Sequence, residues 1–289
     1  MIAVRGLTKR YGGVLAADDV SLDVPAGSVC GLLGRNGAGK TTTFRCLLGF
    51  TTPDSGEVRL DGKPLTPHTF EHLGYVPERP ALYGWLTVAQ HLEFARRTQP
   101  RYDAAFASEL LATFRLDPKK KAKKLSKGQQ TALSLIVALS TRPNILILDE
   151  PASGLDPVMQ RVVLDLFVDA ATSGAAILLS SHQIGQVDRA ADRIAIMRDG
   201  KIVVAGELDD LREASRVVEA TFDGTPPDLS ALGEMKVERA GTSVRLHANG
   251  RADSVAARLG ALGAVSVRVL DRSLEDLFLD AVDDGGLHE

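Results

Sequence analysis

The sequence predicts an α/β protein with a central parallel sheet covered by helices. Segments of strand and helix character alternate from Asn144 to Glu207, which is the pattern of successive βαβ units. The segment 29–34 is apolar on both sides, as expected of a strand buried on both faces. A glycine-rich turn follows that segment and leads into a helix. These three observations favour a sheet whose ligands bind at the carboxyl ends of its strands.

Composition limits the classes of protein to which the chain can belong. It has 289 residues, of which 44% are hydrophobic and 25% charged, so it suits one large or two ordinary globular domains. Lys and Arg total 34 against 37 Asp and Glu, giving a formal net charge of −3. Domains that grip nucleic acid are usually strongly basic, and we therefore expect no nucleic-acid partner.

The cysteines and the apolar runs indicate where the chain resides. Cys30 and Cys46 are too few for a disulfide framework and fit a reducing compartment. The N-terminus lacks the apolar core of a signal peptide. Apolar runs fall well short of the ~18 residues of a membrane span. We expect a soluble, intracellular chain.

The opening third predicts strands separated by turns. β-branched and apolar residues with Gly and Pro between them predict strands at 3–11, 15–24 and 28–34. A helix over 41–49 begins inside the glycine-rich turn. Two more strands are expected within 57–78, as the segments EVRLDG and GYVPE.

The next segment changes to helical character. Apolar residues at three- and four-residue spacing predict a helix over 86–98 with Thr87 as its cap, and the pattern repeats over 102–116. A third helix is expected from Ser126, a good capping residue, to Thr141. The strand–helix alternation described above follows it.

Beyond Arg216 the pattern predicts a small α+β unit of three or four strands. We place the boundary near Glu213, and the Pro226–Pro227 pair indicates a turn inside the unit. The segments with strand or helix character are 217–224, 234–241, 242–250, 254–263 and 264–271. A terminal amphipathic helix, 273–282, ends the pattern.

The strongest local motif is Gly34–Thr41, GRNGAGKT, which matches GxxxxGK(S/T) between a buried strand and a helix. Its glycines let the backbone curl so that successive N–H groups converge on an anion at a helix N-terminus. Lys40 would reach the β- and γ-phosphates and assist catalysis, and the Thr41 hydroxyl would bind Mg²⁺. A chance match in such a chain occurs on the order of once in a hundred. The expected nucleotide-binding residues here are Gly34, Arg35, Asn36, Gly37, Ala38, Gly39, Lys40, Thr41 and Thr42.

A second motif, NILILDE at 144–150, completes the predicted nucleotide site. Its apolar residues bring Asp149 and Glu150 to the carboxyl end of a buried strand. Asp149 is the expected partner of Mg²⁺, and Glu150 is the expected catalytic group that polarises the attacking water. Strands often end in acidic residues, so the pattern gains its weight from the glycine loop that precedes it.

Between these motifs lies LSKGQ, Leu125–Gln129, at the start of a predicted helix. With this order of motifs, the chain resembles the ATP-binding subunits of ABC transporters from its N-terminus to roughly Leu211. The family's signature is LSGGQ; Ser126, Gly128 and Gln129 match it, whereas Lys127 replaces a glycine. The alternative is an ordinary helix start capped by Ser126.

The resemblance implies a P-loop NTPase fold. It implies a parallel RecA-like core sheet, an N-terminal antiparallel β subdomain and a helical subdomain at about 79–142 that carries the signature. The ATP-binding domain would cover 1–213, and a C-terminal accessory α+β domain would cover 214–289.

Weaker matches add three residues to the implied site. Tyr11 stands where the family places an aromatic residue that stacks on adenine, although a strand residue packing on the core is the alternative. Asp156, in the SGLD sequence, corresponds to the usual contact across a dimer interface. His182 corresponds to the switch histidine that contacts the γ-phosphate, although a lone His is more often a polar residue at a strand end.

Glu78 departs from the family pattern. In GYVPE the family usually has Gln at the last position, where it touches Mg²⁺ or its water and links the site to the helical subdomain. A carboxylate can still hold a metal-bound water, but it adds negative charge beside the phosphates. Glu here resembles a variation found among exporter ATPases of the drug and antibiotic-resistance type.

The resemblance also implies partners and cofactors. ATP and Mg²⁺ would be bound between two subunits in a head-to-tail dimer, either a homodimer or a pair with another ATPase subunit. A separate integral membrane permease would dock on the helices between Thr87 and Leu116 and hold the chain at the cytoplasmic face of the cell membrane. The loop around Glu78 would relay the closure of the dimer. The C-terminal sequence SLEDLFLD resembles the accessory tail of bacterial exporter ATPases, which favours export.

Three alternatives stay open. A soluble ABC-type ATPase that acts on DNA or ribosomes usually has a second ATPase half or a long coiled-coil insertion, and this sequence has neither. A kinase or GTPase is disfavoured by the LSKGQ and SGLD sequences. An ABC importer ATPase is disfavoured only modestly.

A run of lysines precedes the signature. The five are Lys119, Lys120, Lys121, Lys123 and Lys124. A solvated surface run is the favoured interpretation. Electrostatic support for ATP and contact with anionic lipid headgroups are the alternatives.

Overall fold

The computed structural model describes residues 1–233, 235–248 and 250–282. The chain divides into two units, Met1–Ala205 and Gly206–Glu289. The predicted boundary near Glu213 falls within the short helix α7, Leu208–Ala214. Glu234, Asn249 and residues 283–289, which the sequence assigns to the C-terminal domain, lie outside the described residues.

A six-stranded sheet in the order β10-β9-β3-β8-β7-β6 forms the centre of the first unit. Strand β3 pairs in parallel with β8 and β9, and β7 pairs in parallel with β8 and β6, which confirms the predicted parallel sheet. Every residue of β3, β7 and β8 is buried. The strands are β3 Val29–Gly34, β6 Leu73–Val76, β7 Ile145–Asp149, β8 Ala176–Ser180, β9 Arg193–Arg198 and β10 Lys201–Glu207.

An antiparallel sheet in the order β2-β1-β4-β5 forms the N-terminal part. Its strands are β1 Ile2–Tyr11, β2 Val14–Val24, β4 Ser55–Leu60 and β5 Lys63–Pro64. Its apolar face shares one hydrophobic core with Phe44 and Leu47 of helix α1, Lys40–Leu47. This packing fixes the helix whose first residue belongs to the predicted phosphate site.

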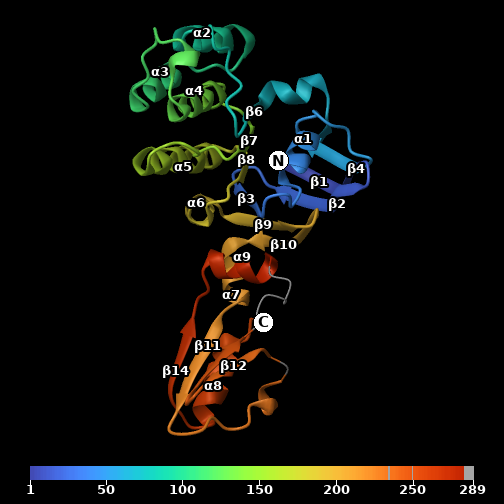
Figure 1. Cartoon of the computed structure of the whole chain (residues 1–289), viewed down its shortest axis with the longest axis vertical. Coiled ribbons are helices and arrows are strands. Elements are labelled where there is room, and N and C mark those ends of the chain that lie inside the picture. Colours follow the sequence, from blue (N-terminus) through green and yellow to red (C-terminus); the bar gives the residue numbers. More distant parts are fainter. Residues whose placement is uncertain (234, 249, 283–289) are drawn as a thin grey trace. The chain divides into compact units, whose positions relative to one another are not determined.

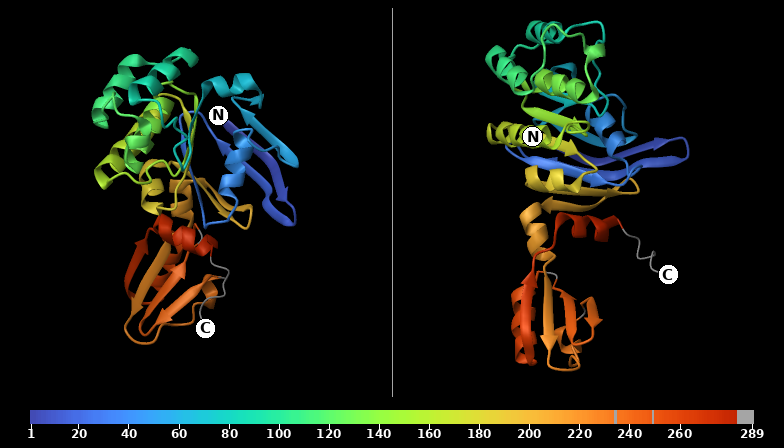
Figure 2. Two further views of the ribbon diagram at one scale, coloured as in Figure 1. Left: turned by 45° about the horizontal axis from the view of Figure 1, so that its top comes forward. Right: turned by 60° about the vertical axis from the view of Figure 1, so that its left-hand side comes forward.

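The helices α2, α3 and α4 lie together, and they and the N-terminal strands flank the central strands on opposite sides (Figures 1 and 2). Their bounds are α2 Val88–Thr98, α3 Ala104–Thr113 and α4 Lys127–Leu139. Thr87 and Ser126 cap α2 and α4 by accepting hydrogen bonds from Gln90 N and Gln129 N, as the sequence predicts.

Two further helices pack against the central sheet, α5 Pro157–Thr172 and α6 Ile184–Ala190. A short 3₁₀ helix spans Pro67–His72 and another spans Ala122–Lys124. Within the described ranges, no helix combines the length and the apolar character needed to cross a membrane.

The second unit contains an antiparallel sheet in the order β12-β13-β11-β14, which agrees with the predicted α+β character. Its strands are β11 Val217–Phe222, β12 Val237–Ala240, β13 Ser243–His247 and β14 Ala264–Leu270, and its later helices are α8 Ala252–Ala261 and α9 Leu274–Val282. Its own core includes Val218, Leu246 and Leu259. A third short 3₁₀ helix spans Ser230–Leu232.

Candidate nucleotide site

The glycine-rich loop joins the carboxyl end of β3 to the N-terminus of α1. Gly37 and Gly39 have φ angles of +84° and +107°, a region that favours glycine. A Cβ on Gly39 would also lie 2.4 Å from the carbonyl oxygen of Ala16. The loop therefore depends on glycine, and it leads into a helix N-terminus that favours anions.

The Lys40 side chain folds back onto this loop and donates hydrogen bonds to its backbone. Its Nζ donates hydrogen bonds to the carbonyl oxygens of Gly34 at 2.6 Å and Arg35 at 3.2 Å. Burial lowers the pKa of Lys40, and the nearby carboxylates of Glu150 and Asp149 oppose that shift. The loop thus presents a partly buried cation beside two acidic residues.

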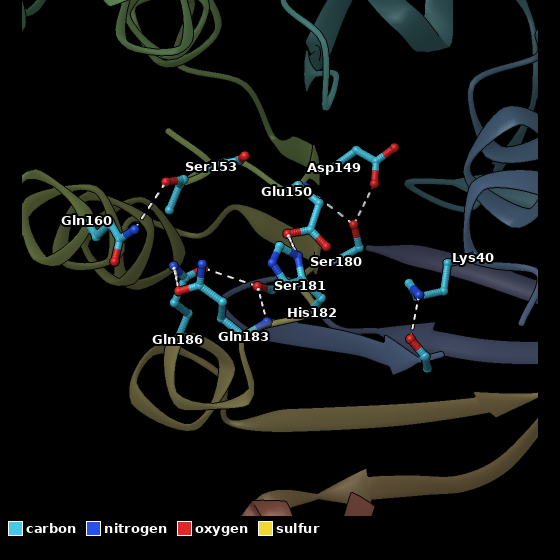
Figure 3. Close-up of polar contacts among 12 residues, drawn as sticks. Lys40, Asp149, Glu150, Ser153, Gln160, Ser180, Ser181, His182, Gln183 and Gln186 are labelled. Atoms are coloured by element: carbon cyan, nitrogen blue, oxygen red, sulfur yellow. Dashed lines mark hydrogen bonds and ion pairs between the residues drawn. The ribbon is translucent and has the colours of Figure 1, made fainter. Parts of the chain in front are cut away.

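The buried Asp149 is oriented by Ser180 on the neighbouring strand. Ser180 Oγ donates to Asp149 Oδ1 at 2.6 Å, and the backbone N–H of Glu150 donates to Ser180 Oγ at 3.3 Å (Figure 3). Desolvation raises the pKa of Asp149, with a further increase from Glu78, whereas the Ser180 hydrogen bond and Lys40 lower it. One hydroxyl therefore positions both consecutive acidic residues.

Glu150 is directed toward His182. The two side chains approach one another in Figure 3, and His182 Nδ1 lies 2.8 Å from Glu150 Oε2. The Glu150 side chain is 16% exposed and that of His182 is 63% exposed. Glu150 has a φ of +51°, in the left-handed region that is uncommon outside glycine.

These groups line one cavity of about 440 Å³. Its lining consists of Ala16, Asn36, Gly37, Ala38, Gly39, Lys40, Thr41, Thr42, Glu78, Asp149, Glu150, Ser153 and His182. The structure thus brings together most of the phosphate-loop residues, the two consecutive acidic residues, Glu78 and His182. It provides backbone N–H groups, one cation and carboxylates around a space suited to a phosphate chain.

The remaining predicted residues do not line this cavity. Tyr11 is 42% exposed at the end of β1, and the Lys9 Nζ lies 5.6 Å from its ring centroid. Gly34 and Arg35 contribute the carbonyl oxygens that Lys40 contacts. Asp156 caps α5 by accepting hydrogen bonds from the backbone of Val158 and Met159.

The signature residues Ser126, Gly128 and Gln129 also lie outside the cavity, at the start of α4. Ser126 and Gln129 form a reciprocal capping box. A Cβ on Gly128 would lie 2.5 Å from the carbonyl oxygen of Gly154, so the helix start approaches the SGLD loop very closely. Lys127 adds a hydrogen bond from its Nζ to Ser153 Oγ at 3.1 Å.

The oxygen groups in the cavity fit Mg²⁺. Thr41 provides a hydroxyl, and Asp149 and Glu78 provide carboxylates. Mg²⁺ is usually held by one or two carboxylates together with substrate phosphates and waters. No cluster of three His, Cys, Asp or Glu side chains able to hold a metal occurs among the residues described. Thr41, Asp149 and Glu78 thus supply oxygen atoms of the kind that Mg²⁺ prefers.

Sequence reasoning missed Ser180, Ser153 and Ala16. Ser180 had a detectable signal, because it ends a predicted parallel strand at the same sheet edge as Asp149. Ser153 begins the SGLD sequence, in which the resemblance indicates only Asp156 as a contact. Ala16 comes from the antiparallel sheet, and no sequence pattern indicates that it borders the loop.

A second cavity of about 600 Å³ adjoins the first. Thr41, Glu78 and Asp149 line both cavities. The other walls of the second cavity are largely aromatic and apolar, including Phe50, Tyr75, Leu82, Tyr83 and Phe94. The phosphate cavity thus adjoins an apolar groove beside the helical group, by which we mean α2, α3 and α4.

Residues 17–153 match a family model described as ABC transporter. The ABC transporter ATP-binding protein YtrB of Bacillus subtilis is 34% identical, over 77% of this chain and 77% of that protein. The Nod factor export ATP-binding protein I of Rhizobium meliloti is 35% identical, over 96% of this chain and 87% of that protein. A solved structure of an ATP binding subunit of an ABC transporter superimposes with a TM-score of 0.69 at 32% identity, covering 73% of this chain and 92% of that one.

Proposed function

Because the chain belongs to the ATP-binding proteins of the ABC transporter family, we propose that it is the ATPase subunit that powers export through a separate membrane permease. The observation that carries this proposal is the convergence of Lys40, Asp149 and Glu150 on one cavity at a helix N-terminus. ABC ATP-binding subunits pair with permeases and dimerise. For this chain we propose a membrane permease and a second ATPase subunit as the partners.

Binding of ATP and Mg²⁺ would use the loop backbone and the side chains of Lys40, Thr41 and Asp149. The N–H groups around Gly37–Gly39 and the Lys40 ammonium hold the phosphates. Thr41 and Asp149 would hold Mg²⁺, with Glu78 beside them. A Mg²⁺ ion held there would supply positive charge to offset the negative charge that develops on the phosphoryl oxygens.

Glu150 is the group that we assign to the attacking water. Its place in the lining of the phosphate cavity, in contact with His182, supports this role. His182 positions Glu150 and would contact the γ-phosphate. Transfer of the γ-phosphoryl group to water then depends mainly on the positioning of the reactants and on stabilisation of the charge on the phosphoryl oxygens.

The complete site would require a second subunit, as a homodimer or with a related ATPase. Ser126, Gly128 and Gln129 lie at a helix N-terminus outside the cavity and would close on ATP held by the partner. Asp156 would contact the dimer interface, and Tyr11 would stack on adenine. ATP binding closes this dimer and hydrolysis reopens it.

The apolar groove beside the helical group would receive the permease. Tyr83 and Phe94, which are 48% and 54% exposed, form an edge-to-face pair at its rim. Glu78 and Asp149 line both the groove and the phosphate cavity. A permease bound in the groove would therefore act directly on residues of the hydrolytic site. The chain would thus sit peripherally at the cytoplasmic face of the membrane.

The proposed direction of transport rests on a relative. The Nod factor export protein covers 96% of this chain, so the similarity extends into the second unit. Similarity to an export protein over both units favours export over import. We propose an ATP-binding domain at 1–213 and an accessory domain at 214–289. We assign the accessory domain to dimer stabilisation or regulation.

The substitution Glu150→Gln tests the proposed function. It keeps the shape of the side chain but removes the carboxylate, so we expect unchanged ATP affinity and a loss of turnover of at least about 100-fold, the lower range for general-base catalysis. The variant should accumulate as an ATP-bound dimer, measured by size exclusion with and without Mg²⁺ and ATP. Glu207→Gln, on the edge strand β10, is the matched control and should hydrolyse ATP at the parental rate.

The same trapped variant also tests the transport assignment. Affinity purification from detergent-extracted membranes should recover it with a membrane protein of several spanning helices. Parental ATP turnover by Glu150→Gln contradicts the assignment of Glu150. Recovery of the variant only as a soluble dimer, bound to DNA or to ribosomes, contradicts the transport role.

A further inference from the structure

The aromatic loop 83–87 and the lysine run 120–124 lie side by side in antiparallel fashion. Ala122 N donates to Leu86 O at 2.9 Å, and Lys123 N donates to Gly84 O at 3.1 Å. Thr87 and Lys121 form an isolated antiparallel bridge. Two segments that are distant in sequence therefore form one surface.

Trp85 is held outward on this surface. Its side chain is 68% exposed, whereas Ala122 on the neighbouring segment is 2% exposed. The buried His91 anchors the loop, because Tyr83 N donates to its Nε2 at 3.1 Å and its ring Nδ1 lies 2.9 Å from Thr87 O. The chain thus exposes a large apolar ring, its single tryptophan, on a fastened loop.

The positive charge around Trp85 is concentrated and unneutralised. Residues 115–127 contain seven basic side chains and one acidic side chain, a net charge of +6 in a chain of net charge −3. In the part of the chain that the structure describes, no ion pair joins their lysines to a carboxylate. Lys120 and Lys127 contact the neutral acceptors Gln129 and Ser153.

We propose that this surface binds anionic lipid headgroups directly. We name it the Trp85–lysine face, and it consists of Trp85, Lys119, Lys121, Lys123 and Lys124, all of them exposed. Lysines near an anionic bilayer each favour binding roughly fivefold, and tryptophan lies preferentially at the boundary between headgroups and acyl chains.

A lipid surface fits this face better than a compact anion does. The ammonium groups are spread along an exposed segment, and Trp85 and the four lysines line none of the described cavities that border the site. A compact anion leaves Trp85 in water, whereas a bilayer surface accommodates the ring and the charges together. The face adds a membrane contact to the proposed docking on a permease and does not depend on ATP turnover.

The experiment uses the full chain with lipid vesicles and no permease. Vesicles contain phosphatidylcholine alone or equal parts of phosphatidylcholine and phosphatidylglycerol. We expect the fluorescence of Trp85 to shift to shorter wavelength with the anionic vesicles, and sedimentation with those vesicles to fall as salt rises. Neutral vesicles and inorganic phosphate should leave the emission unchanged.

A charge-reversal variant and a matched control assign the binding to this face. Each lysine favours vesicle binding roughly fivefold, so Lys121→Glu combined with Lys123→Glu and Lys124→Glu should weaken it at least roughly a hundredfold. The control reverses three exposed lysines elsewhere, Lys63, Lys201 and Lys236, and should bind vesicles far more tightly than the first variant. Both variants should still bind ATP, which shows that they fold.

Several outcomes overturn the proposal. These are no binding of the parental chain to anionic vesicles, binding without a change in Trp85 emission, or equal weakening by the two variants. Tighter binding to single-stranded nucleic acid than to vesicles, or membrane recruitment only when a permease is present, also overturns it. Failure of Glu150→Gln to trap a dimer leaves the vesicle result unaffected, so the two proposals are tested separately.

Discussion

At the scale of single residues, Asp149 is the group whose environment most affects the chemistry of the site. Its carboxylate is buried, and desolvation raises its pKa despite the hydrogen bond from Ser180. Only the deprotonated carboxylate can hold Mg²⁺. As the pH falls, Asp149 therefore loses its deprotonated, Mg²⁺-binding form at a higher pH than an ordinary carboxylate does.

This shift predicts a pH dependence of nucleotide binding. The affinity for ATP in the presence of Mg²⁺ should fall as the pH drops through the raised pKa of Asp149, whereas the affinity without Mg²⁺ should fall less. Titration of a fluorescent ATP analogue from neutral to mildly acidic pH measures both. Asp149→Asn should remove most of the difference between the two curves.

The stability of the chain should depend on pH differently from the affinity for ATP with Mg²⁺. A carboxyl whose pKa is raised by folding contributes stability below that pKa and loses it as the pH rises, so protonation of Asp149 does not itself destabilise the chain. Protonation of Asp149 should therefore not by itself lower the melting temperature of the nucleotide-free chain over the range in which Mg²⁺-dependent affinity falls. A parallel fall of both quantities would assign the effect to unfolding.

At the scale of elements, the start of α4 shows how closely two loops are packed. Gly128 faces the carbonyl of Gly154, and Lys127 lies along the same loop. This approach leaves no room for a side chain at residue 128. The residue that the signature requires is thus also required by packing.

Gly128→Ala should destabilise the chain, because its Cβ would lie 2.5 Å from Gly154 O. Overpacking of this kind costs about 1–3 kcal/mol, more than the gain in helix propensity of Ala over Gly. Urea denaturation measures the change. Gly185→Ala in α6 is the matched control, because a Cβ there meets nothing within 4 Å, and it should be neutral or stabilising. Equal stability of both variants would contradict the packing argument.

Local patterns predicted most elements of the fold. The caps Thr87 and Ser126 and the buried strands follow from residue types at short spacing, and the structure confirms them. The helix Leu208–Ala214 was not predicted because it is short and no side chain caps it. The 3₁₀ helix at Pro67–His72 has no buried residue and so has no apolar periodicity to detect.

The contacts within the site depend on the tertiary fold. Spacing and resemblance indicated Glu150 and His182 separately, but their contact joins positions 32 residues apart on adjacent strand ends. The Ser180–Asp149 bond and the approach of Ala16 to Gly39 arise in the same way. A single sequence contains no periodic signal for such pairings.

At the scale of the whole molecule, the two units have separate hydrophobic cores. The first core includes Phe44 and Leu47, and the second includes Val218 and Leu246. Each core is formed by strands and helices of its own unit. The first unit contains the whole of the phosphate cavity.

Deletion of the chain from Arg216 onward should therefore leave a folded protein that binds ATP with parental affinity. In a Glu150→Gln background, the proposed accessory role predicts that the ATP-bound dimer dissociates at a higher protein concentration than the full chain, as measured by analytical ultracentrifugation. An insoluble product would contradict the independence of the first unit. Unchanged dimerisation in that background, together with an unchanged ATPase rate when the deletion is made in the parental chain, would contradict the accessory role.

The placement of Ser126 and Gly128 outside the phosphate cavity has a kinetic consequence. If both halves of a site must meet, ATP turnover by dilute chains is second order in protein, and an isolated subunit hydrolyses little ATP. Two subunits held on one permease meet at an effective concentration in the millimolar range, whatever their number in the cell. Assembly alone would then switch hydrolysis on where transport can occur.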